Sequence, residues 1–224
     1  MIKMDFTTTA MARPEIVERT YASFSKNLKG IDLKECRLFI NIDPLPSGKD
    51  RKEVTKVAKK YFREVIPNYP DKPNYTAAYN WLWSSAESNI IFNLEDDWEL
   101  IEEVPIPELV DHFNNYPEMM EVALRAYTYE YPKCPTSPCL MGKKYYKAVG
   151  GKLNITLNPE IQLRGRKFGI EMPNPKDKIP FKGKLIVYPE NKVILKDIGR
   201  SWLKRSNYRR PKKKARFTSW ETKK

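Results

Sequence analysis

The chain has 224 residues, with 41 Lys and Arg, 28 Asp and Glu, one His and three Cys. This length suits one α/β domain with or without an extension, and the sequence holds no apolar run long enough to cross a bilayer. One histidine and three cysteines cannot build a standard structural zinc site, and an odd cysteine count argues against a disulfide framework. We therefore expect a cytoplasmic protein without integral membrane association, whose chemistry depends on carboxylates and hard metal ions.

The positive charge is concentrated at the C-terminus. Residues 200–224 carry eleven basic side chains and one acidic one, which gives +10 of the total +13 and leaves +3 for the rest of the chain. The sequence therefore predicts a folded domain at residues 1–199 and a basic extension at residues 200–224.

The first half alternates strand-like and helix-like segments, which is typical of an α/β sheet. Pro14 suits the first turn of a helix, and Gly30 suits its end. Asn74 is a favoured residue for capping a later helix. We expect strands at Lys3–Thr9, Arg37–Ile42, Glu64–Ile66 and Asn89–Leu94, and helices after Pro14, around Val54–Phe62 and after Asn74.

The second half has weaker patterns. We expect helices at Ile106–Asn115 and Lys143–Val149 and strands at Val122–Ala126, Cys139–Gly142 and Val193–Asp197, the last of these closing the fold. Residues 172–184 are rich in Pro, Lys and Asp and predict a loop. From Arg200 onward no hydrophobic periodicity predicts a packed element.

Three adjacent carboxylates, Glu95, Asp96 and Asp97, follow the apolar strand that ends at Leu94. In open α/β sheets ligands bind beyond the carboxyl ends of the strands. Adjacent carboxylates repel one another unless they are solvated or neutralised, and Mn²⁺ or Mg²⁺ prefers oxygen ligands. Strand alternation would turn Glu95 and Asp97 to the same side. The cluster indicates either a divalent metal site or a solvated acidic turn.

Four segments, taken in order, resemble family 2 GT-A glycosyltransferases. The segments are TTTAMARPE at Thr7–Glu15, FNLEDDW at Phe92–Trp98, LMGKKYYKAVGG at Leu140–Gly151 and PEIQLR at Pro159–Arg164. They match the family's first strand and helix, its metal-binding acidic motif, its strand–helix–Val-Gly-Gly segment and its catalytic helix. One departure is that the family shows paired acids in the catalytic helix, whereas here only Glu160 is present.

This resemblance implies a GT-A fold, with a mixed, mostly parallel sheet flanked by helices, and a nucleotide-sugar donor. It implies a Mn²⁺ or Mg²⁺ ion held by Asp97 and Glu95, with Glu160 as the catalytic base of an inverting transfer. Asp197 is the alternative base. The residues expected to contact the donor are Thr8, Ala10, Arg13, Asp43, Glu95 and Asp96.

A basic group follows the strand predicted to be the last. Arg200, Lys204 and Arg205 can bind the donor diphosphate, because a guanidinium matches the geometry of phosphate oxygens. The alternative is that the tail has no ordered structure, above all beyond residue 211.

The tail also suggests an acceptor, because it mixes aromatic and basic side chains. Cationic side chains bind nucleic-acid phosphates, and aromatic rings such as Trp202, Tyr208, Phe217 and Trp220 stack on exposed bases. The expected nucleic-acid-binding residues are Arg209, Arg210, Lys212, Lys213, Lys214 and Arg216. We expect the acceptor to be duplex DNA with a hydroxymethylated base, in a bacteriophage, with the target nucleotide flipped out of the helix.

Three alternatives remain at this stage. The tail can dock on an anionic membrane surface, with a surface polysaccharide or lipid-linked glycan as the acceptor. The chain can be a nucleic-acid-binding module without activity, although this leaves the acidic cluster without a purpose. A nucleotidyltransferase would want a glycine-rich phosphate loop near the N-terminus, and residues 1–29 contain no glycine.

Overall fold

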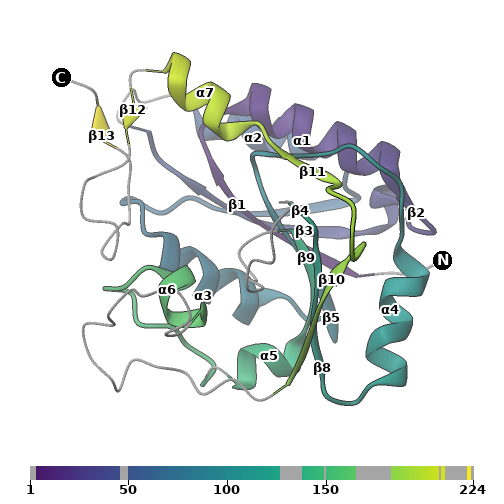
Figure 1. The fold of residues 1–224 in the computed structure, drawn as a ribbon. Coiled ribbons are helices and arrows are strands. Elements are labelled where there is room, and N and C mark those ends of the chain that lie inside the picture. The colour runs from purple at the N-terminus through teal and green to yellow at the C-terminus, as the bar shows by residue number, and fades with distance from the viewer. Residues whose placement is uncertain are drawn as a thin grey trace.

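The fold is a three-layer α/β/α arrangement in a computed structural model that describes residues 4–45, 50–126, 138–148, 150–164, 183–206, 208–209 and 221–222. Figure 1 shows the central sheet with α1, α2 and α7 on one side and α3, α5 and α6 on the other. The first half consists of β1 (Asp5–Met11), α1 (Pro14–Asn27), β2 (Leu28–Lys29), a 3₁₀ turn (Leu33–Glu35), β3 (Arg37–Asp43), α2 (Arg51–Ala58), β4 (Glu64–Asn68), α3 (Tyr75–Ser85) and β5 (Ile90–Glu95). The second half consists of β6 (Trp98–Leu100), β7 (Val104–Pro105), α4 (Ile106–Asn115), β8 (Met119–Leu124), β9 (Cys139–Gly142), α5 (Lys143–Ala148), α6 (Pro159–Arg164), β10 (Lys184–Tyr188), β11 (Leu195–Asp197), α7 (Gly199–Arg205), β12 (Tyr208–Arg209) and β13 (Glu221–Thr222).

The main sheet has seven strands in the order β10-β8-β9-β5-β1-β3-β4. The pairs β1/β3, β1/β5, β3/β4 and β8/β10 are parallel, whereas β9 runs antiparallel to both of its neighbours. The predicted mixed, mostly parallel sheet flanked by helices is thus confirmed. Because β1, β3 and β5 are parallel, their carboxyl ends meet at one edge of the sheet, where ligands bind in such folds.

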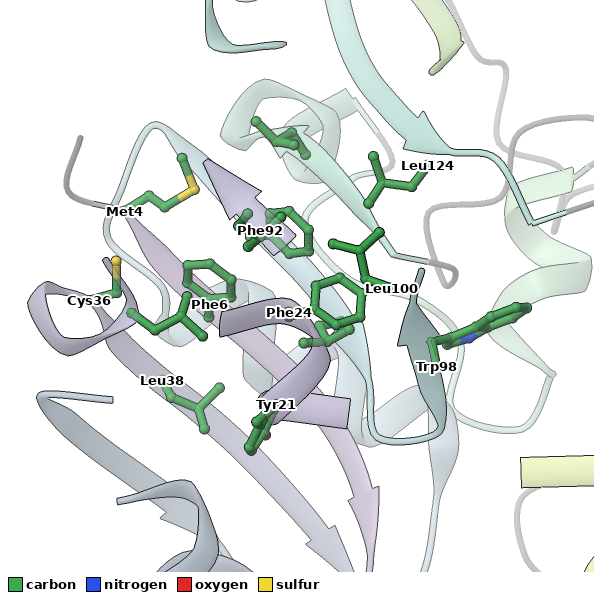
Figure 2. Close-up of a cluster of buried hydrophobic side chains, with 14 of the residues drawn as sticks. Met4, Phe6, Tyr21, Phe24, Cys36, Leu38, Phe92, Trp98, Leu100 and Leu124 are labelled. Carbon is green, nitrogen blue, oxygen red and sulfur yellow. The ribbon is translucent and has the colours of Figure 1, made fainter. Parts of the chain in front are cut away.

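Two hydrophobic cores cover the two faces of the sheet. Alternation along the strands sends Phe6 and Phe92 to the core beneath α1 and α2, where their rings stack with centroids 4.9 Å apart (Figure 2). The opposite core holds Ile91, from the same strand as Phe92, against Leu82 and Trp83 of α3. Both faces are therefore buried, as expected for strands that read as continuous apolar runs.

Local sequence signals account for several helix ends. Pro14 occupies the first turn of α1, and the Asn74 side chain accepts a hydrogen bond from Ala77 N at 2.9 Å to cap α3. The prediction for Gly30 was wrong, since α1 ends at Asn27 and the chain continues into β2. Gly30 has φ +77° and lies so close to Pro107 that a Cβ would stand 2.5 Å from Pro107 Cγ.

The C-terminal third departs most from the sequence prediction. Strand β10 was not predicted, and its first residue, Lys184, was assigned to the loop predicted at residues 172–184. Residues 172–182 of that loop lie outside the described residues. The tail was expected to lack packed elements, but α7 begins at Gly199 and crosses the predicted domain boundary at 199/200. Within the described residues no helix is both long and apolar enough to cross a membrane.

Candidate active site at the carboxyl edge of the sheet

The acidic cluster lies at the edge where β1, β3 and β5 end. Glu95 is the last residue of β5 and pairs in register with Thr9 of β1. Asp96 N donates to Thr9 O at 3.2 Å, so the turn that carries Asp96 and Asp97 stays attached to β1. The chain then enters β6 at Trp98. The strand ends and this turn place the cluster where the sequence predicted it.

Asp96 forms a buried ion pair with Arg13. The Arg13 Nη2 atom lies 2.5 Å from Asp96 Oδ1, and Arg13 Nε lies 3.3 Å from Asp96 Oδ2. Met11 N also donates to Asp96 Oδ2, at 3.0 Å. Asp96 is 4% exposed and Arg13 is 2% exposed. Both side chains are thus inside the protein and bonded to each other, and their expected contact with the donor stays a prediction.

Asp97 is the more accessible acid of this turn. Its side chain is 24% exposed, and its Oδ2 atom accepts a hydrogen bond from Arg13 Nη2 at 3.2 Å. Its backbone oxygen accepts from Ile198 N at 2.9 Å, which attaches the C-terminal segment to the turn. Of the three adjacent acids, Asp97 is thus the one best placed to meet a ligand.

Glu95 is held by two neutral donors. The Tyr75 hydroxyl donates to Glu95 Oε1, and Trp98 Nε1 donates to Glu95 Oε2 at 2.8 Å. Burial, together with the negative charges of Asp97 and Glu160, raises the pKa of Glu95 to about 8. Sequence reasoning missed Tyr75, whose position 20 residues before Glu95 carries no signal for contact.

Glu160 reaches the same site from the other half of the chain. Its negative charge contributes to the raised pKa values of both Glu95 and Tyr75, which reflects its closeness to them. Its helix, α6, begins where Asn158 Oδ1 accepts from Glu160 N at 2.8 Å. Glu160 therefore lies near enough to Glu95 for its charge to act on that carboxyl, and its role as the base stays a prediction.

Helix α3 holds the segment that leads to Glu160. The Thr76 hydroxyl donates to Leu157 O, and Asn80 Nδ2 donates to Leu153 O at 2.9 Å. Asn80 Oδ1 accepts in return from Leu153 N at 2.7 Å. These bonds hold the segment before α6 against α3, although the two lie more than seventy residues apart in the sequence.

Asp43 ends β3 at the same edge of the sheet. Asn41 Nδ2 donates to Asp43 Oδ1 at 2.8 Å, and Asn68 Nδ2 donates to Asn41 Oδ1 at 2.7 Å. Burial raises the pKa of Asp43 to about 7, against the opposing effect of the Asn41 bond. The two amides orient one oxygen of the Asp43 carboxylate. The expected contact between Asp43 and the donor nucleoside stays a prediction.

Two of the predicted donor contacts lie in the interior. Thr8 is fully buried, and the Ala10 side chain packs in the core beneath α1 and α2. Contact between these residues and a donor stays a prediction. The threonine-rich sequence of β1 does not reveal how deeply this strand is buried.

The basic residues of α7 are exposed. Arg200, Lys204 and Arg205 all face solvent. Arg200 Nε lies 2.7 Å from Asp197 Oδ2, and Arg200 N donates to Asp197 Oδ1 at 2.9 Å. Asp197, the alternative base, thus accepts a backbone hydrogen bond at the start of α7 and pairs with the Arg200 side chain. Diphosphate binding by the three cations stays a prediction.

Two aromatic residues of the tail are packed on the protein. Trp202 and Tyr208 stack with centroids 5.7 Å apart, and Tyr208 is 9% exposed in a cluster with Met11 and Leu45. They were expected to stack on nucleic-acid bases, which this packing contradicts. The Arg209 side chain and the residues Arg210, Lys212, Lys213, Lys214, Arg216, Phe217 and Trp220 lie outside the described part of the structure.

The acidic site suits a divalent cation only with help from a ligand. Across the described residues, no three His, Cys, Asp or Glu side chains are arranged to hold a metal ion. Glu95, Asp97 and Glu160 nevertheless bring several carboxylates close together, with Arg13 as the buried cation paired to the turn. A Mn²⁺ or Mg²⁺ ion held by Asp97 and Glu95 therefore stays a prediction, and such an ion would need further ligands from a bound diphosphate and water.

Comparison with known proteins supports the fold. No family model and no curated protein matches the sequence. Among solved structures, S. aureus TarS 1–349 superposes with a TM-score of 0.60 over 86% of this chain, at 8% sequence identity. The fold is similar to that of TarS. The chain spans 60% of the length of that fragment.

Two further structures of TarS are similar to the chain. S. aureus TarS superposes with a TM-score of 0.53, over 72% of this chain and 33% of TarS, again at 8% identity. TarS 1–349 in complex with UDP-GlcNAc has a TM-score of 0.49, over 67% of this chain and 49% of that one, at 8% identity. At such low identity the likeness to TarS concerns the fold.

Proposed function

We propose that this chain is a metal-dependent glycosyltransferase that moves a sugar from a nucleotide-sugar donor to a hydroxyl acceptor. The observation that supports this most is the position of Glu95 and Asp97 at the carboxyl edge of a TarS-like sheet, where the charge of Glu160 also acts on Glu95. TarS itself has been crystallised with UDP-GlcNAc and with UDP. The same edge is where an open α/β sheet binds phosphorylated ligands.

In this proposal each acid has its own task. Asp97, with Glu95 beside it, holds Mn²⁺ or Mg²⁺, which when bound neutralises the negative charge of the leaving diphosphate. Glu160 accepts the proton of the acceptor hydroxyl. At the same time the hydroxyl oxygen bonds to the anomeric carbon of the sugar, and the bond between that carbon and the diphosphate breaks. A single displacement of this kind inverts the anomeric configuration. Asp43 contacts the nucleoside, and Arg200, Lys204 and Arg205 contact the diphosphate.

For the acceptor, we propose a hydroxymethylated base in duplex DNA, in a bacteriophage host cell. The support is the charge of +10 on residues 200–224, which favours a polyanion. With Trp202 and Tyr208 packed on the protein, this support comes from charge and no longer from those two rings. A surface polysaccharide or lipid-linked glycan is the alternative acceptor.

The test of the proposed reaction is donor binding and donor turnover in the same protein. Calorimetry with nucleoside diphosphates and sugar nucleotides, each with Mn²⁺, should identify a donor class that binds wild type and binds Asp97→Asn at least about tenfold more weakly. Hydrolysis or transfer of that donor should require the ion and stop in EDTA. Asp111→Asn, an exposed change on α4, is the matched control.

Two outcomes would redirect the assignment. If no sugar nucleotide binds or turns over with either ion, the chain is not a nucleotide-sugar transferase. Release of pyrophosphate from a nucleoside triphosphate and a sugar phosphate would instead indicate a nucleotidyltransferase.

A further inference from the structure

Trp202 of α7 touches three parts of the molecule. Its indole Nε1 donates to Glu15 Oε1 at 3.3 Å, and its ring stacks on Tyr208 with an interplanar angle of 9°. The guanidinium carbon of Arg13 lies over the same indole, 4.8 Å from the ring centroid. The ring thus connects the C-terminal segment to Arg13 and Glu15, the two charged residues of the Arg-Pro-Glu sequence.

Arg13 extends this connection to the acidic turn. Its Nη2 atom lies 2.5 Å from Asp96 Oδ1 and 3.2 Å from Asp97 Oδ2. One guanidinium therefore joins the Trp202 ring to both aspartates. Since the Arg13 side chain is only 3% exposed, water has little access to it while the ring is in place.

The main chain next to Trp202 attaches to the same turn. Strand β11 pairs antiparallel with β6, with Asp197 opposite Trp98. One residue later, Ile198 N donates to Asp97 O at 2.9 Å. The described residues 195–206 and 208, which we call the C-terminal strap, therefore reach Asp97 directly through the backbone and indirectly through the Trp202 ring and Arg13. Figure 1 shows β11 and α7 on the side of the sheet that α1 and α2 cover.

We propose that Trp202 is a positioning residue for the acidic site: it holds Arg13 on Asp96 and Asp97 and so sets the orientation of the Asp97 carboxylate. The inference rests on the proposed function, because the orientation of Asp97 matters for the ion and diphosphate that this carboxylate would receive. A cation over an aromatic face is attracted by the ring, and the attraction grows when the cation is withdrawn from water, as Arg13 is. The ring also excludes water that would otherwise compete for the guanidinium hydrogens.

A purely structural role makes a different prediction. Trp202 and its neighbour Leu203 both pack against the cluster of Met11, Ala12, Leu45 and Tyr208. If packing is the whole role, removing either side chain should loosen α7 and lower stability without a specific effect on Arg13. Leu203→Ala is therefore the matched control, because Leu203 packs against the same cluster and has no aromatic ring that could lie over Arg13.

The experiment compares Trp202→Ala, Trp202→Phe and Leu203→Ala in the full chain. The first readout is the NMR signal of the Arg13 Nε–H, whose exchange with water should be slow in wild type and at least about tenfold faster in Trp202→Ala. The second is binding of Mn²⁺ in the presence of UDP, followed by electron paramagnetic resonance, which should weaken about three- to tenfold. Trp202→Phe keeps a ring over Arg13 and should restore both values, whereas Leu203→Ala should change only the melting temperature.

The inference is overturned if Trp202→Ala behaves like Leu203→Ala, losing stability while Arg13 exchange and Mn²⁺ affinity stay at their wild-type values. Failure of Trp202→Phe to restore them would also overturn it. If wild type binds no Mn²⁺ in the presence of UDP, the metal-dependent function fails, and the exchange of the Arg13 Nε–H still decides whether Trp202 holds Arg13.

Discussion

Gly199 lies directly against the Asp97 carboxylate. A Cβ built on Gly199 would overlap the Oδ2, Cγ and Cβ atoms of Asp97, well inside van der Waals contact. Gly199 begins α7, and the preceding residue, Ile198, bonds to the backbone of Asp97. A side chain at position 199 would therefore force the Asp97 carboxylate to move from the place it occupies here.

Gly199→Ala should damage the acidic site and the C-terminal strap together. Forcing a methyl group into a packed contact costs about 1–3 kcal/mol, so the melting temperature should fall by several degrees. Affinity for Mn²⁺ with UDP should fall as well, since Asp97 must move. Calorimetry and thermal unfolding measure the two effects. Gly142→Ala is the control, because its Cβ would meet Phe113 at 3.4 Å, an ordinary contact; equal behaviour of the two variants would contradict this account.

Glu160→Gln should separate chemistry from donor binding. The substitution keeps the shape of the side chain and removes its basicity, so transfer should fall by about a hundredfold or more. Binding of the donor should change little. Single-turnover transfer and calorimetry measure these quantities side by side. If transfer survives in Glu160→Gln and is lost in Asp197→Asn, the base is Asp197, even though that carboxylate is bonded to Arg200.

Asp43→Asn should stabilise the free protein at high pH. The pKa of Asp43 is raised to about 7 in the folded chain, mainly by burial, against about 4 when unfolded. The folded state therefore binds this proton more tightly, and the wild type loses stability as pH rises from about 4 to about 7. The stability of Asp43→Asn relative to wild type should rise over this range, by about 1–3 kcal/mol after allowance for partial exposure.

Urea unfolding at pH 5 and pH 8 measures this difference. The matched control is Asp71→Asn, an exposed aspartate whose replacement should give no comparable change with pH. A constant difference between Asp43→Asn and wild type at both pH values would show that Asp43 does not titrate in this range. The same variant reports on the donor, because loss of the carboxylate should weaken nucleoside binding if Asp43 contacts it.

The sequence predicted the elements that build the carboxyl edge, because their signals are local. The apolar strand before Glu95 and the Asn74 cap each depend on a few neighbouring residues. The bounds of α4, Ile106–Asn115, were predicted without error. What the sequence did not reveal depends on contacts between distant segments. Trp202 packs on Arg13 across nearly the whole chain. Strand β10 is an exception, because its apolar run between Gly183 and Pro189 is a local signal that the prediction did not use.

The candidate site follows the same division. Glu95 and Asp97 were predicted from a motif and lie at the predicted edge of the sheet, where the charge of Glu160 acts on Glu95. The same motifs did not predict that Arg13 and Asp96 form a buried ion pair, in which the guanidinium needs a carboxylate partner. Residue type and spacing do not distinguish a cation that binds substrate from one that pairs within the core. That distinction depends on burial, which three-dimensional packing decides.

The DNA acceptor makes a prediction about salt. If the basic tail binds duplex phosphates, the logarithm of the affinity should fall linearly with the logarithm of the salt concentration, by about 0.9 for each phosphate contacted. Replacing Arg210, Lys212, Lys213, Lys214 and Arg216 by Gln removes five cations and should reduce this slope by up to about four. Tyr208 stays in place, so its packing on Met11 and Leu45 is kept.

The control for the tail variant removes the same charge elsewhere. Gln at five exposed lysines of the domain surface, Lys26, Lys34, Lys52, Lys56 and Lys59, lowers the net charge equally. If DNA binding depends on the tail, this control should keep most of the wild-type slope, because its lysines do not contact the duplex.

Sugar incorporation into hydroxymethylated DNA must accompany binding, since affinity for a polyanion alone does not make DNA the acceptor. Equal slopes for the two variants would show that the tail does not bind the duplex. Binding to anionic vesicles together with transfer to a lipid-linked glycan would assign the acceptor to the membrane alternative. At such a surface a basic tail gains about 1 kcal/mol per cation.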